Sequence, residues 1–70
     1  MNDFIEKFAE AIEADASAIS GDTLFRELNE WNSLAGLSVI AMFDEEYGKE
    51  LPIPAFKAAK TVADLYALAQ

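Results

Sequence analysis

Ser33 is the residue best placed to take part in covalent chemistry, because it follows Asn32 at the start of a helix-forming segment. A serine in the first turn of a helix lies beside unpaired backbone N–H groups and the positive end of the helix dipole, which stabilise an attached phosphate. The position therefore suits a phosphoester. Serine is also an ordinary residue at helix starts, so local physics alone favours the simpler role of helping to cap the helix.

Catalysis by the chain alone is not expected, and no catalytic residue is assigned. Histidine and cysteine are both absent, which removes a Ser-His triad, a cysteine nucleophile and the usual zinc sites. Asp15 and Asp22 lack the alternating acidic positions of a calcium loop, so no metal site is expected. A chain of 70 residues also has little room for an enclosed active site.

The chain is strongly acidic, with 13 Asp and Glu against 5 Lys and Arg and a net charge of -8. This balance argues against nucleic-acid binding, which needs clustered Lys and Arg. It favours basic protein partners, although solubility alone explains it equally well. No apolar run approaches membrane-spanning length, and the N-terminal residues have no apolar signal segment. A cytoplasmic protein without membrane insertion is therefore expected, and nothing suggests more than a monomer.

Helical periodicity predicts one all-α domain over residues 1–70, a bundle of three longer helices and one short helix with a long first loop. The first helix is expected over 3–14, begun by a capping pair of Asp3 and Glu6. A long connection over 15–31 follows. Its apolar residues are expected to hold it to the core, namely Ala18-Ile19, Leu24-Phe25 and Leu28. Trp31 is expected to pack under the next helix.

The central helix is expected over 33–47, capped by Asn32 and ended by Gly48 in a left-handed conformation. Its C-terminal end is acidic, which costs about 0.3–1 kcal/mol per exposed charge through the helix dipole. That local cost hints at a purpose in recognition. Pro54 is expected at the first position of a short helix over 54–59, and Thr61 is expected to cap the last helix.

The central segment resembles an acyl carrier protein. The matching residues are Asn32-Ser33-Leu34, then Leu37, Ile40, Phe43, Asp44, Glu45, Glu46, Tyr47, Gly48 and Glu50-Leu51-Pro52. In that family an Asp-Ser-Leu triplet opens the second helix, which ends in an acidic run, an aromatic residue and a turn. The order and spacing agree without a gap. Phe25 and Thr61-Val62 extend the resemblance to essentially the whole chain.

The resemblance implies a four-helix bundle that carries 4'-phosphopantetheine on Ser33, with acyl groups held as thioesters on the thiol of the arm. It implies partners in fatty-acid or specialised, polyketide-like biosynthesis: a phosphopantetheinyl transferase and acyl-loading and acyl-modifying enzymes with basic docking patches. The implied recognition positions are Asn32, Leu34, Asp44, Glu45 and Glu46. Acyl chains would be sheltered against Leu37, Ile40, Phe43 and Val62.

The chain departs from the family pattern at three positions of the central segment. Asn32 replaces the usual Asp, which could weaken or redirect recognition by a transferase, and Ala35 and Ser38 stand where fatty-acid carriers have acidic residues. Trp31 before the triplet is similar to carriers that act beside specialised biosynthetic enzymes. Two alternatives stay open: an aminoacyl or peptidyl carrier, for example for D-alanine, and an unmodified acidic adaptor between proteins.

Overall fold

The computed structural model describes all residues 1–70 and contains helices but no strand. Four α-helices form the bundle: α1 (Asn2–Ile12), α2 (Ser33–Tyr47), α3 (Ile53–Ala58) and α4 (Val62–Leu68). Two 3-10 helices, η1 (Ala16–Ala18) and η2 (Phe25–Glu27), lie in the long first loop. The predicted all-α bundle is confirmed. No helix combines the length and the apolar character needed to span a membrane.

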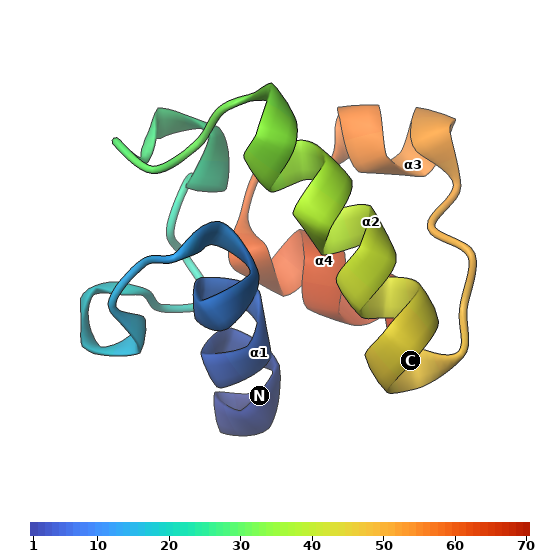
Figure 1. Cartoon of the computed structure of the whole chain (residues 1–70), viewed down its shortest axis with the longest axis horizontal. Coiled ribbons are helices and arrows are strands. Elements are labelled where there is room, and N and C mark those ends of the chain that lie inside the picture. The colour runs from blue at the N-terminus through green and yellow to red at the C-terminus, as the bar shows by residue number, and fades with distance from the viewer.

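The longest helix, α2, lies between α1 and α3, with α4 behind it (Figure 1). Its two ends are set by the residues that flank it, as predicted. The side chain of Asn32 caps the start, and Gly48 adopts a left-handed conformation with φ 60° at the end. Gly48 and Lys49 return their N–H groups to the carbonyls of Asp44 and Phe43, which satisfies the last turn.

The predicted starts of two other helices are wrong. No side chain caps α1, whose cap position is Met1, so the expected pair of Asp3 and Glu6 does not form a capping box. Helix α3 begins at Ile53 after Pro52, which puts Pro54 second rather than first. Because the first four N–H groups of a helix have no partner within it, a proline at the second position loses no hydrogen bond.

The long first loop is held to the start of α4 by its backbone. Val62 N–H donates to the carbonyl of Thr23 at 3.1 Å, and Ala63 N–H donates to the carbonyl of Gly21 at 2.9 Å. Among the expected apolar anchors, Ile19 and Phe25 are buried and Leu28 is half-buried against the core, whereas Ala18 is exposed and Leu24 is 45% exposed. The anchoring role predicted for Ala18 and Leu24 is therefore wrong. Leu24 instead holds the loop through its backbone, which forms a bridge with Thr61.

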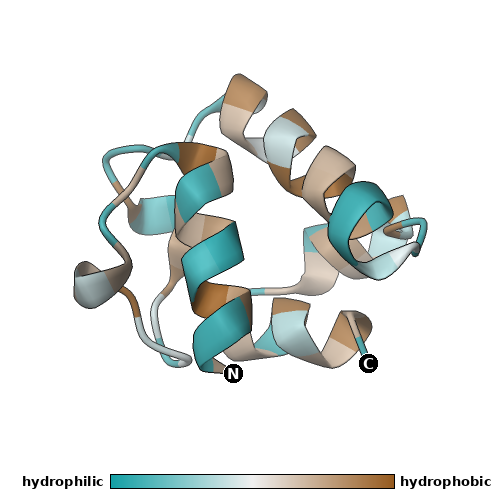
Figure 2. Cartoon of the chain, turned by 60° about the horizontal axis from the view of Figure 1, so that its bottom comes forward, coloured by the Kyte–Doolittle hydropathy of each residue, from teal (hydrophilic) through white to brown (hydrophobic).

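The core contains 16 buried residues, all of them apolar, drawn from all four helices, the first loop and the short segments that follow α2, α3 and α4. Aromatic rings run through it in series: Phe4 of α1 stacks on Phe8, Phe8 meets Phe25 of the loop, and Phe25 stacks on Phe56 of α3 at 6.3 Å between centroids. Such pairs contribute about 0.5–1.5 kcal/mol each beyond their buried area. Figure 2 shows hydrophilic residues along α1 and at the C-terminal end of α2. The core thus fixes α2 against α1 and α3.

Candidate functional site

Ser33 is the first residue of α2, and its side chain is exposed. Asn32 supplies the cap, with its Oδ1 accepting from the N–H of Ala35 at 2.7 Å, and its carbonyl accepts from Gly36 N–H at 3.1 Å. The N–H groups of Ser33 and Leu34 remain without a partner inside the helix. Because Asn32 already fills the capping role, the Ser33 hydroxyl is free for other chemistry.

A groove of about 620 Å³ opens beside Ser33, between α2 and α3. Its apolar surface comes from both helices and from the end of the first loop. The lining residues are Arg26, Trp31, Asn32, Ser33, Gly36, Leu37, Ile40, Ile53, Phe56 and Lys57. Trp31 packs against Phe25 at 4.9 Å and against Phe56 at 6.1 Å between ring centroids, so it forms part of the groove wall at the start of α2, as predicted.

The four residues predicted to shelter an acyl chain do not share one surface. Leu37 and Ile40 line the groove, and the Leu37 side chain is 65% exposed. Phe43 and Val62 are completely buried inside the packed core. A chain in the groove therefore reaches Leu37 and Ile40 directly, whereas contact with Phe43 or Val62 requires the core to open.

The acidic residues at the end of α2 point to different sides of the helix. Asp44 lines a small groove of about 430 Å³ with Lys49 and Glu50. Glu45 and Glu46 line another of about 290 Å³ on the α1 side. Glu46 also pairs with Lys7 of α1, at 3.9 Å between Oε1 and Nζ. Asp44 and Glu45 are exposed and have no cation within salt-bridge distance.

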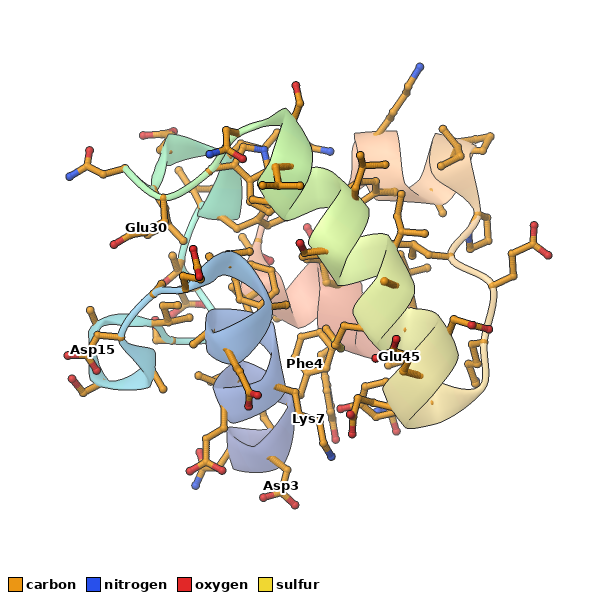
Figure 3. The ribbon with its side chains drawn as sticks, in the orientation of Figure 1. Asp3, Phe4, Lys7, Asp15, Glu30 and Glu45 are labelled. Atoms are coloured by element: carbon orange, nitrogen blue, oxygen red, sulfur yellow. The ribbon has the colours of Figure 1, made fainter.

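Tyr47 closes the acidic end of α2 and is a packing residue. Its ring lies 6.0 Å from that of Phe4, which points from α1 into the space between α1 and α2 (Figure 3), and Lys7 lies 5.5 Å from the Tyr47 ring centroid. Burial raises the pKa of the Tyr47 phenol, with Lys7 acting in the opposite direction. The phenol therefore stays neutral at physiological pH.

Another groove, of about 450 Å³, lies on the other side of the Asn32 cap and is lined by acidic residues from α1, its C-terminal cap and the first loop. Glu10, Glu13 and Glu30 line it with Asn32 and Leu34. Leu34 is 72% exposed, which leaves this predicted recognition residue open to a partner. Glu30 and Glu45, both labelled in Figure 3, lie near opposite ends of α2. The acidic surface is thus wider than the three residues at the end of α2.

Arg26 is the site residue that sequence reasoning missed. Its guanidinium donates to the carbonyls of Phe56, at 2.6 Å, and Ala59, and it lies 4.7 Å from the Phe25 ring centroid and 5.5 Å from that of Phe56. It therefore holds the C-terminal end of α3 in place and completes one wall of the groove. The adjacent Phe25 offered a weak local signal, but nothing indicated partners 30 and 33 residues away.

The model of the phosphopantetheine attachment site family matches residues 2–69, and the chain therefore belongs to that family. Members carry a covalently attached 4'-phosphopantetheine, are typically non-catalytic carriers, and interact with transferases and biosynthetic enzymes. No curated protein and no solved structure showed significant similarity to the chain.

The residues at the start of α2 fit the prosthetic group of the family. The exposed Ser33 hydroxyl can form the ester, and the unpaired N–H groups of Ser33 and Leu34 can receive phosphate oxygens. No carboxylate lines the groove beside Ser33, so no lining charge opposes a phosphodiester there. When bound, the group supplies a thiol, which this chain lacks because it has no cysteine.

Proposed function

We propose that Ser33 is the attachment residue and that the chain carries acyl groups as thioesters on a 4'-phosphopantetheine arm. The observation that supports this proposal best is the exposed Ser33 hydroxyl at the N-terminus of a 15-residue helix whose cap is provided by another residue. The remaining serine of α2, Ser38, is half-buried in the middle of the helix, where every backbone N–H has a helical partner.

We further propose that α2 is the docking element for partner enzymes with basic patches in fatty-acid or specialised biosynthesis. The exposed Leu34 offers an apolar contact near the attachment site, and Asp44 and Glu45 offer unpaired negative charge at the other end of the helix. Charge of this kind steers the encounter with a basic partner more than it adds affinity. Glu46 contributes less, because it is partly neutralised by Lys7.

The experiment is an intact-mass measurement after incubation with coenzyme A and a broad-specificity phosphopantetheinyl transferase. Wild type and Ser38→Ala are expected to gain one phosphopantetheine, whereas Ser33→Ala gains none. Ser38→Ala is a matched control because it makes the same change five residues further along the same helix. A gain on folded Ser33→Ala would overturn the assignment. Failure of wild type with an active transferase would favour an unmodified adaptor.

A further inference from the structure

The groove beside Ser33 is cationic in a strongly acidic chain. The chain has 13 acidic and 5 basic residues, yet no acidic side chain lines the groove, whereas two of the five basic residues do. These are Arg26 and Lys57. Every other groove described above has at least one carboxylate in its lining. The surface next to the attachment residue therefore has the opposite charge to the rest of the molecule.

The two cations are not neutralised by carboxylates of the chain. The salt bridge of the structure joins Lys7 to Glu46, so neither Arg26 nor Lys57 has a carboxylate within 4.0 Å. Arg26 is held rigidly by two carbonyls and two aromatic rings. Lys57 is exposed on α3. The groove thus presents two positive charges that have no carboxylate partner within the chain.

Between the charges the groove is apolar and uncovered. Leu37 is 65% exposed and Ile53 is 47% exposed, and both line it together with Ile40. Covering these side chains with methylene groups removes apolar surface from water, which is favourable. A complementary occupant therefore has an apolar stretch followed by a negative charge. An aminoacyl group carries a positive ammonium instead, which the two cations would repel.

We propose that the groove receives acyl cargo that ends in a carboxylate, with its methylene groups on Leu37, Ile40 and Ile53 and its carboxylate beside Lys57 and Arg26. This proposal rests on the proposed function, because attachment at Ser33 is what brings the cargo to the groove. Tethering makes docking intramolecular, so a weak contact suffices to populate it. Lys57 is then a specificity-determining residue for the cargo.

The test uses the protein loaded at Ser33 with an adipoyl thioester that is ¹³C-labelled at its free carboxyl group. Intact mass verifies the loading, and ¹³C NMR measures the pKa of the carboxyl on the protein and on free adipoyl-pantetheine. A carboxyl group that is not bound in the groove has its pKa raised, because the net charge of -8 disfavours its ionised form. A docked carboxyl has its pKa lowered by about 0.5, which corresponds to a roughly threefold preference for the charged form.

Lys57→Gln is expected to abolish the lowered pKa, whereas Lys60→Gln keeps it, because Lys60 is a nearby exposed lysine that does not line the groove. Adipoyl is also expected to perturb the backbone amide shifts of Leu37, Ile40 and Ile53 more than neutral hexanoyl does. A wild-type pKa at or above that of free adipoyl-pantetheine, or an equal fall in Lys57→Gln, would overturn the proposal. Failure to load Ser33 would instead overturn the proposed function.

Discussion

Replacing glycine by alanine is expected to change the stability of the protein in opposite directions at Gly36, inside α2, and at Gly48, at its end. Gly36 lies inside the helix, where glycine is less favourable than alanine by about 1 kcal/mol. A Cβ at Gly36 would lie 3.8 Å from Cζ2 of Trp31 and 3.9 Å from Cε2 of Phe56, which are ordinary contacts. Gly36→Ala therefore gains helix propensity without a clash and is expected to stabilise the protein by about 1 kcal/mol.

Gly48→Ala is the matched control. Gly48 has a φ of 60° at the end of α2, and a Cβ there meets nothing within 4 Å. The effect is therefore purely conformational, because an L-residue in the left-handed region costs about 1–2 kcal/mol. Gly48→Ala is expected to destabilise the protein by at least about 1 kcal/mol.

Thermal unfolding followed by circular dichroism measures both effects. For 70 residues, an unfolding entropy of about 2.1 cal/mol/K per residue makes 1 kcal/mol equivalent to about 7 °C in Tm. Gly36→Ala should therefore melt about 7 °C above wild type, and Gly48→Ala at least about 7 °C below it. A lower Tm for Gly36→Ala would refute the spacing between α2, Trp31 and Phe56. An unchanged Tm for Gly48→Ala would refute the left-handed end of α2.

Two further predictions concern caps. Asn32→Ala removes the acceptor for Ala35 N–H and is expected to lower the free energy of unfolding by about 1 kcal/mol. Asn32→Asp keeps the cap and is expected to stay within about 0.5 kcal/mol of wild type. Urea unfolding measures both variants, and equal losses of stability would argue against the cap. Asp64 accepts from the N–H groups of Lys60 and Thr61, which lowers the pKa of its carboxyl. The contribution of Asp64 to folding stability is therefore complete above its unfolded pKa of about 3.9. It is lost as the pH falls through the lower pKa of the folded state. Asp64→Asn should lower urea stability at pH 7 and lose this effect in strong acid, and an equal loss at both pH values would contradict it.

The elements that could be predicted from the sequence are those fixed by residues close along the chain. Asn32 and Gly48 set both ends of α2, and Thr61 caps α4 through a capping box with Asp64. The residue types at these positions are sufficient to predict the helix ends, because a cap makes its hydrogen bonds with backbone groups only a few residues away. The start of α1 was predicted wrongly by the same logic, because Met1 rather than Asp3 occupies the cap position.

The groove beside Ser33 could not be predicted, because its walls come from segments that are distant in the sequence. Arg26 meets the end of α3 about 30 residues away, and Lys57 faces α2 across the groove. The burial of Phe43 and Val62 and the exposure of Leu37 likewise depend on how α2 and α4 are rotated against their neighbours. Helical periodicity places these residues on a helix but does not say which neighbour covers them.

The central claim is most directly tested by locating the prosthetic group on the chain. Trypsin cleavage after Arg26 and Lys49 releases residues 27–49, which contain two serines, Ser33 and Ser38. Fragmentation of this peptide from the modified protein distinguishes the two positions by the fragments that retain the added mass. The account predicts the phosphopantetheine on Ser33 alone, and its appearance on Ser38 or outside this peptide would contradict it.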